Sequence, residues 1–174
     1  RSVRGYSVYD ALLQCEDLLE QFGGHKYAAG LTLSLDNVDN FKAKFEEVVS
    51  NSITEEQQIP KINIDLEVNL DDLDMKFYKI ITQMAPFGPG NMTPVFIAKN
   101  VVDAGGSRIV GETKEHLRLE IKQGNSVKTV GIAFSMADKL DVVKSGKPFD
   151  VCFTLELNEW KGKQSLQLMV RGVR

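Results

Sequence analysis

The glycine-rich segment at 22–30 holds the residues best suited to bind an anion. Gly23 and Gly24 free the backbone to approach a ligand closely, and successive N–H groups there can form an anion-binding nest. His25 adds an imidazole donor, and the small residues at 28–30 let a ligand or a neighbouring chain come near. The same residues also fit a helix cap followed by a tightly packed strand, and spacing alone favours that structural role.

A second group of residues, in the last third of the chain, has the chemistry to hold a nucleic-acid strand. Single-strand binding needs a positively charged groove and aromatic rings on which bases stack. The run Trp160-Lys161-Gly162-Lys163 offers one ring and two ammonium groups at a hairpin tip, although a solvated turn with a partly buried Trp fits it equally well. The candidate DNA contacts are Lys114, Arg118, Lys128, Trp160, Lys161 and Lys163.

Five aspartates resemble metal ligands at first sight. Those that precede a predicted helix are better placed to cap its N–H groups and to interact with its dipole. The chain has 2 histidines, His25 and His116, and no carboxylate cluster surrounds either one. We therefore expect capping roles for the aspartates, and no metal or cofactor held by this chain. The aspartates are Asp36, Asp39, Asp71, Asp72 and Asp74.

Hydrophobic periodicity predicts the elements that position these residues. Apolar residues three and four apart indicate helices, and strict alternation indicates strands. Ser7 and Asp10 resemble a capping box, and Gly23-Gly24 is expected to end the first helix. The predicted elements are a helix over 7–22, a strand over 31–35, a helix over 38–49, a loop over 51–58, a strand over 62–70 and a helix over 73–84, which stops at the Pro/Gly turn of residues 86–91.

The remainder of the chain is predicted to be almost entirely β. Turns at Gly124-Asn125 and Lys161-Gly162 indicate hairpins, and a short helix over 136–143 separates the third strand from the fourth. This layout is that of an OB-type five-stranded barrel, with a small unrelated β-barrel as the competitor. We expect Phe134, Phe149 and Phe153 to fill the barrel and His116 to be structural. The predicted strands are 95–102, 117–122, 127–134, 151–157 and 166–170.

Composition limits the class of protein. Hydrophobic residues make up 43% and charged residues 26% of 174 residues, which is typical of a soluble globular protein. No apolar run approaches the ~20 residues that span a membrane, and no signal peptide is evident. Cys15 and Cys152 lie far apart and are expected to be buried core thiols of a cytosolic protein, with a disulfide as the less favoured alternative. The chain opens Arg1-Ser2-Val3-Arg4 rather than with Met, so we expect a piece of a longer protein.

The net charge of −3 argues against a strongly basic nucleic-acid binder, but the charge is unevenly distributed. Residues 1–58 carry 5 basic and 10 acidic side chains, whereas residues 59–174 carry 16 basic and 14 acidic ones. Strand-binding charge must therefore be local, in the second half or on a few placed residues.

Three stretches, in chain order, resemble RecJ-type single-strand-specific exonucleases of the DHH phosphoesterase superfamily. Arg1-Ser2 resembles the end of a motif that lies just upstream in that family. Gly23-Gly24-His25 followed by Ala28-Ala29-Gly30 is similar to the signature of the DHH-associated domain. The turn at 86–91 followed by Pro94-Val95-Phe96 looks like the segment leading into the RecJ OB domain.

The resemblance implies an α+β chain: a DHH-associated part over 1–70, a connecting helix and loop over 71–92, and an OB-fold domain over 93–174. It implies a single-strand-binding fragment of a cytoplasmic 5′-to-3′ DNA exonuclease of repair and recombination, with no membrane association. Two divalent ions, manganese or magnesium, would be held by a DHH catalytic domain of the same polypeptide, and no Asp-His-His run occurs here. This chain alone is expected to be inactive.

The resemblance also assigns the phosphate contacts to five residues: Arg1, Ser2, Gly23, Gly24 and His25. Two alternatives stay open at this point. One is a free-standing single-strand-binding OB protein. The other is a fragment of a DHH phosphodiesterase for short oligonucleotides or cyclic dinucleotides, or the related domain of an alanyl-tRNA synthetase.

Overall fold

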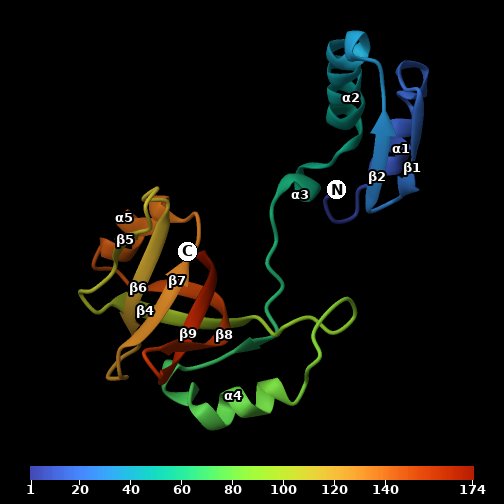
Figure 1. Ribbon diagram of the computed structural model, residues 1–174. Helices are drawn as coiled ribbons and strands as arrows, with labels where there is room; N and C mark the ends of the chain where they lie inside the picture. The colour runs from blue at the N-terminus through green and yellow to red at the C-terminus, as the bar shows by residue number, and fades with distance from the viewer. The chain divides into compact units, whose positions relative to one another are not determined.

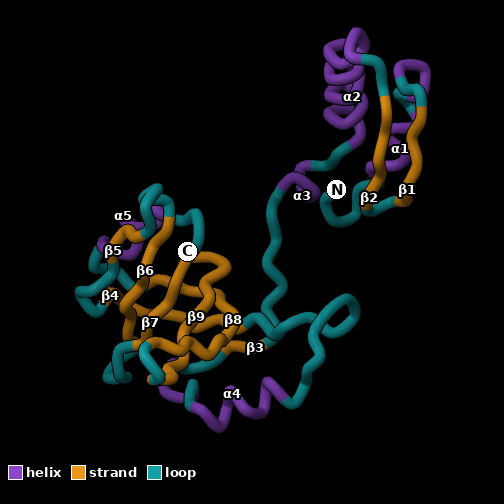
Figure 2. Tube along the Cα trace, viewed as in Figure 1, coloured by secondary structure: helices purple, strands orange, loops and turns teal.

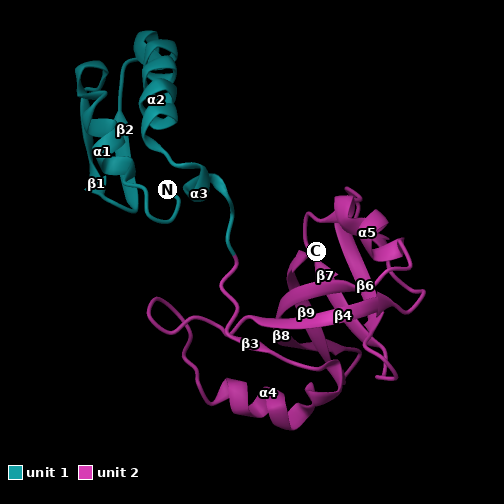
Figure 3. Cartoon of the chain, turned by 180° about the vertical axis from the view of Figure 1, so that it is seen from behind, with its two compact units in different colours: residues 1–61 teal, residues 62–174 magenta.

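Two units make up the chain in the computed structural model, which describes residues 1–174: residues 1–61 and residues 62–174 (Figure 3). The sequence predicted a connection over residues 71–92. In the structure those residues belong to the same unit as the strands that follow them. No helix in either unit has the length and apolar character needed to cross a membrane.

Unit 1, residues 1–61, is a β-hairpin packed against helices. Helix α1 lies against both strands of the hairpin and also touches α2 (Figure 1). The buried apolar residues of unit 1 are Ala11, Leu12 and Cys15, so the core of this unit is small. The elements are α1 (Val8–Leu13), a 3-10 turn (Glu16–Leu18), β1 (Gln21–His25), β2 (Ala28–Thr32), a second 3-10 turn (Leu35–Asn37), α2 (Val38–Ser52) and α3 (Glu55–Gln58).

The helix predicted over 7–22 is wrong beyond Leu13. Ser7 caps α1 as expected by accepting a hydrogen bond from the Asp10 N–H. The apolar spacing then continues through the 3-10 turn into β1, where Phe22 packs on the Tyr9 ring, 5.7 Å between centroids. Periodicity alone could not separate a long helix from a short helix followed by a strand, because both bury the same side chains.

Two further predictions for unit 1 need correction. The strand placed at 31–35 is β2 at Ala28–Thr32, and Leu35 is 90% exposed. The loop placed at 51–58 instead contains the end of α2 and the short helix α3, which a capping box between Thr54 and Gln57 starts. The helix predicted over 38–49 is confirmed as α2.

Unit 2, residues 62–174, is built on a seven-stranded sheet, which Figure 2 shows in orange. All five predicted strands are present as β4, β6, β7, β8 and β9, and the predicted short helix lies between β7 and β8. The elements are β3 (Leu66–Glu67), a 3-10 turn (Leu70–Asp72), α4 (Met75–Thr82), β4 (Phe96–Asp103), β5 (Arg108–Val110), β6 (His116–Lys122), β7 (Thr129–Ala133), a 3-10 turn (Ala137–Lys139), α5 (Leu140–Lys144), β8 (Phe149–Trp160) and β9 (Lys163–Val173).

Five strands of unit 2 are paired in a closed series, in which the last strand pairs with the first. The order is β3-β4-β8-β9-β7-β6-β5, and β4 also pairs with β6, so β4, β8, β9, β7 and β6 form a circuit. Every pairing in the circuit is antiparallel except β7 with β9. Only the short strands β3 and β5 lie outside it.

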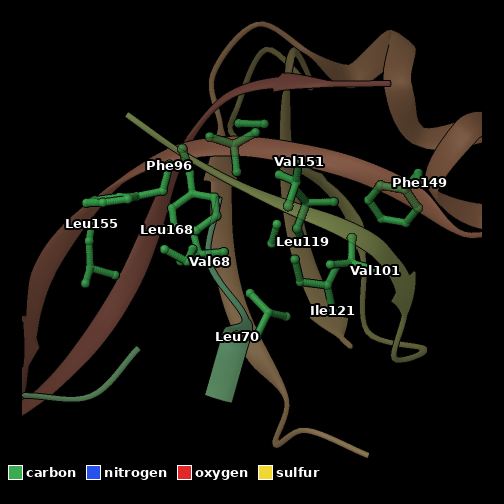
Figure 4. Packing of buried hydrophobic residues seen from close by; sticks show 14 of the residues in the cluster. Val68, Leu70, Phe96, Val101, Leu119, Ile121, Phe149, Val151, Leu155 and Leu168 are labelled. Carbon is green, nitrogen blue, oxygen red and sulfur yellow. The ribbon is translucent and has the colours of Figure 1, made fainter. Parts of the chain in front are cut away.

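Side chains from all five strands of the circuit meet in one apolar core (Figure 4). On β6, Leu117, Leu119 and Ile121 are fully buried, so the residues between them point outward. Phe149 and Phe153 fill the core as expected. Phe134 does not: it follows the end of β7, in the turn before α5, and is 54% exposed.

The segment before β4 differs from its prediction. Of the strand expected over 62–70, only Leu66 and Glu67 pair with a neighbouring strand, in parallel with the start of β4. The helix expected over 73–84 is α4, and Asp74 caps it by accepting from the Phe77 N–H at 2.7 Å. The turn at 86–91 is held by the Asn91 amide, which donates to the carbonyls of Met84 and Pro86.

Candidate nucleic-acid interface

The two neighbouring glycines of unit 1, Gly23 and Gly24, differ in whether the fold requires a glycine at their position. Gly24 has a φ of +142° and pairs with Ala29 across the hairpin, and a Cβ on it would lie 2.4 Å from the Ala28 carbonyl oxygen. Gly24 is therefore required by the hairpin itself. Gly23 pairs with Gly30, and a Cβ on either would meet nothing within 4 Å. The fold of unit 1 does not require a glycine at these two positions.

The expectation that Gly23 and Gly24 end a helix is wrong. Both lie inside strand β1, so their N–H groups are part of a strand backbone and not of a helix end. His25 is exposed at the end of β1. Its Nδ1 accepts from the Tyr27 N–H at 3.3 Å, which leaves Nε2 as the ring nitrogen that can contact a ligand. Lys26 and Tyr27, which the sequence analysis passed over, lie in the same turn, with the Lys26 ammonium 6.0 Å from the Tyr27 ring centroid.

The structure brings Ser2 to this turn. The Ser2 N–H donates to the Tyr27 carbonyl at 3.0 Å, and its hydroxyl donates to the Tyr6 carbonyl. The hydroxyl is thus already engaged, and Arg1, the exposed neighbour of Ser2, carries the free charge. Ser2 and His25 therefore lie at the same end of the β1–β2 hairpin, and Arg1 precedes Ser2 in the chain.

In unit 2 the hairpin between β8 and β9 ends in an exposed aromatic ring and two lysines. Trp160 is 70% exposed and pairs with Lys163, and Lys161 and Gly162 both have positive φ, as a two-residue type I′ turn requires. Neither Lys161 nor Lys163 forms an ion pair. Two ammonium groups and one ring are available to solvent there.

The outer face of β5 and β6 carries a second group of cations. Arg108 on β5 pairs with Arg118 on β6, and directly paired residues project from the same face of a sheet. Lys128, just before β7, reaches the same place, where its Nζ lies 3.0 Å from Glu120. We name Arg108, Arg118, Glu120 and Lys128 the β6 charge cluster.

Glu120 lies at the centre of the β6 charge cluster. One carboxylate oxygen accepts from Lys128 at 3.0 Å, and the other lies 3.5 Å from an Arg118 guanidinium nitrogen. The pKa of Glu120 lies below its ordinary value, mainly because of the Lys128 hydrogen bond, and the charge of Arg118 adds to the effect. Glu120 is therefore ionised at neutral pH.

The remaining predicted residues are separate from these groups. Lys114 lies in the turn between β5 and β6 with a φ of +54°. His116 is structural, as expected, because its Nδ1 accepts from the Ser135 N–H at 3.2 Å and its ring packs edge-on against Phe134. Sequence reasoning missed Arg108, because a three-residue strand shows no periodicity. The sequence signal for this short strand was the glycines on both sides of it, at positions 105, 106 and 111, which indicate turns.

No group of three or more histidine, cysteine or carboxylate side chains is arranged to hold a metal ion. Of the five aspartates, only Asp74 has the predicted cap hydrogen bond. The residues present do not fit a divalent-ion centre. Both cysteines are free thiols, Cys15 buried and Cys152 half-buried.

Comparison with known proteins gives the same architecture. The family described as RecJ OB domain matches residues 64–172. The single-stranded-DNA-specific exonuclease RecJ of Bacillus subtilis is 29% identical over 98% of this chain, and that of Haemophilus influenzae is 32% identical over 98%. The chain covers 22% and 30% of those two relatives. The crystal structure of RecJ from Thermus thermophilus in complex with Mn²⁺ superposes over 100% of this chain with a TM-score of 0.75 at 24% identity.

The strand circuit and the match at 64–172 define unit 2 as an OB domain, a class whose members bind oligonucleotides and oligosaccharides. The chain belongs to the RecJ family, whose OB domain it contains.

Proposed function

We propose that unit 2 binds single-stranded DNA, as the strand-holding part of a RecJ-type 5′-to-3′ exonuclease. The match of the RecJ OB domain to the strands that carry the exposed cations supports this proposal most directly. In OB folds the outer face of the second and third strands binds oligonucleotides, and these strands correspond to β6 and β7 here. We also propose that the β4-β8-β9-β7-β6 circuit is the closed five-stranded OB barrel.

Two exposed basic groups would contact the strand. The β6 charge cluster supplies guanidinium and ammonium donors for phosphate oxygens. The β8–β9 hairpin tip supplies Lys161 and Lys163, together with Trp160 as a stacking platform. Residues 97–174 carry 13 basic and 9 acidic side chains, which favours contacts in this part of the chain.

Unit 1 would be part of a DHH-associated domain that contacts a phosphate. Ser2 and His25 lie at one end of its hairpin with Arg1 next to Ser2 in the chain, and a guanidinium and an imidazole donor suit a phosphodiester oxygen. The fold of unit 1 does not require a glycine at position 23. A glycine there is consistent with the close approach of a ligand or of another domain to the backbone.

Hydrolysis would be performed by a DHH domain outside this chain, in a cytoplasmic enzyme of DNA repair and recombination. Two divalent ions there would activate water and stabilise the leaving oxygen. We expect the 174-residue chain, incubated with labelled single-stranded DNA and Mn²⁺, to leave the strand intact. Shortening of the strand that co-purifies with the protein would refute this expectation.

The strand-binding proposal is tested by reversing the charges at the hairpin tip. Lys161→Glu with Lys163→Glu should weaken binding of a fluorescent oligo-dT. It should also reduce the slope of log affinity against log salt by about 0.7 per lost phosphate contact, or about 1.4 for two. Anisotropy titrations at several salt concentrations measure both quantities.

The matched control is Lys76→Glu with Lys147→Glu, which changes the net charge equally. Lys76 lies on α4 and Lys147 precedes β8, a 12-residue strand away from the hairpin tip. The control should keep most of the affinity. An equal loss in both double variants would mean that binding follows net charge alone, and would remove the hairpin tip from the strand path.

A further inference from the structure

The Glu120 carboxylate packs against the backbone of Gly106, where there is no room for a side chain. A Cβ on Gly106 would lie 2.3 Å from one carboxylate oxygen and 2.5 Å from the carboxyl carbon, so a larger residue there would push the carboxylate away. The Glu120 N–H donates to the buried Ser107 hydroxyl at 2.9 Å, and its carbonyl accepts from the Ala104 N–H at 2.8 Å. The β4–β5 loop therefore fixes Glu120 through its backbone.

The side chain itself is not needed to hold this loop. Its two oxygens contact Lys128 and Arg118 instead, and the Lys128 side chain is 62% exposed. Water solvates and screens the Lys128 charge, so its pairing with Glu120 contributes little to folding, whereas the Arg118 and Glu120 side chains are only 25% and 21% exposed. The function of the carboxylate must therefore be sought in what it does to the two cations.

A carboxylate and a phosphodiester offer the same thing to these cations, which is an anion with two oxygens that accept charge-assisted hydrogen bonds. While Glu120 accepts from Lys128 and Arg118, neither cation is fully available to a DNA phosphate. A phosphate that approaches either cation also approaches a negative charge, which repels it.

We propose that Glu120 is a built-in competitor for the DNA phosphate. It occupies Arg118 and Lys128 when no strand is bound, and gives them up when a phosphate arrives. The inference rests on the proposed strand binding by unit 2. Its consequence is a low affinity for any one phosphate, so that the strand can advance over the β6 charge cluster without being trapped there.

The test is Glu120→Gln, which keeps the shape of the side chain and removes its charge. Affinity for oligo-dT at low salt should rise roughly fivefold, the factor that corresponds to one pair of unit charges about 4 Å apart in water. The salt slope should steepen by up to about 0.7 for each freed cation. Thermal unfolding should be nearly unchanged.

Glu67→Gln is the matched control. Glu67 pairs with Lys99 at 2.6 Å on β3 and β4, so the same substitution there also frees one lysine and changes the net charge equally. Its affinity should stay at the wild-type value. In a Lys128→Ala background, the gain from Glu120→Gln should shrink, since one of the cations that it would free is missing.

Each outcome decides the question. A wild-type chain that binds oligo-dT, with Glu120→Gln equal or weaker, overturns the competitor and leaves the strand-binding proposal standing. An equal gain from Glu67→Gln, or a gain unaffected by Lys128→Ala, also overturns it. Absence of salt-sensitive binding in both the wild type and Glu120→Gln contradicts the proposed function itself, and the inference with it.

Discussion

Replacing each of the two adjacent glycines of β1 by alanine separates a structural glycine from one that the unit does not need. Gly24 has a φ of +142°, and its added Cβ would lie 2.4 Å from the Ala28 oxygen and 2.5 Å from the Ala29 Cα. Both are backbone atoms of the paired strand, so the hairpin must open to accept the methyl group. Gly23 would place the same methyl group in open space.

The expected magnitudes differ in sign. A residue held in a glycine-only backbone region costs about 1–3 kcal/mol, and relieving the overlap with the opposite strand costs about 1–3 kcal/mol more. Gly24→Ala should therefore destabilise the hairpin by roughly 2–6 kcal/mol. Gly23→Ala should change stability by less than about 1 kcal/mol, in the stabilising direction, because it restricts the unfolded chain.

Native-state hydrogen exchange of the β1 and β2 amides measures the local effect. A loss of about 2.8 kcal/mol in Gly24→Ala corresponds to exchange roughly a hundredfold faster. The amides of β6 and β7 in unit 2 are the internal control and should be unaffected. Wild-type exchange in Gly24→Ala, or fast exchange in Gly23→Ala, would refute the structural explanation of these glycines.

Three further predictions follow from single side chains. His25→Ala should change the stability of the chain by less than about 0.5 kcal/mol, because a surface donor is lost, and should slow cleavage about ten- to a hundredfold in a full-length enzyme; melting and turnover of the same variant test both. Thr154→Val should raise the unfolding free energy by about 1 kcal/mol, because the buried Thr154 hydroxyl has no hydrogen-bond partner; denaturant titration measures it, and a loss would contradict the explanation. Burial raises the pKa of Asp103, but hydrogen bonds from Ser107 and Lys144 outweigh it, so the pKa lies below its ordinary value. The stability from Asp103 should be fully present above about pH 4 and disappear as pH falls through the lowered pKa; Asp103→Asn should flatten that decline.

The five strands of the circuit in unit 2 could be predicted because each buries one face in a single core. Leu117, Leu119 and Ile121 alternate with polar residues, and the turn residues Gly124 and Gly162 mark two hairpins. The helix at 7–22 was predicted too long, since Leu18 and Phe22 keep helical spacing although they lie in a turn and a strand. Gly24 was identified as special, but its reason is a close approach to Ala29, which only the paired strand reveals.

The candidate site was only partly predictable. Arg118 and Lys128 were singled out by charge. Their common partner Glu120 and their neighbour Arg108 were not, because which residues meet depends on the register between neighbouring strands. Phe134 was expected inside the barrel because large aromatic residues are usually buried. It follows the end of β7, where the chain leaves the sheet, and its ring is half exposed.

The circuit of strand pairings bears on how unit 2 folds. The β6–β7 and β8–β9 hairpins join neighbouring segments and can form early, whereas the pairing of Phe96 with Phe153 joins residues far apart in sequence. Closing the long loop between such residues costs entropy before their contacts stabilise the chain, and this slows folding. We therefore expect substitutions in the Lys161-Gly162 turn to slow folding, and substitutions at Phe96 mainly to speed unfolding. Stopped-flow folding and unfolding rates of both variants would show whether the hairpins precede ring closure.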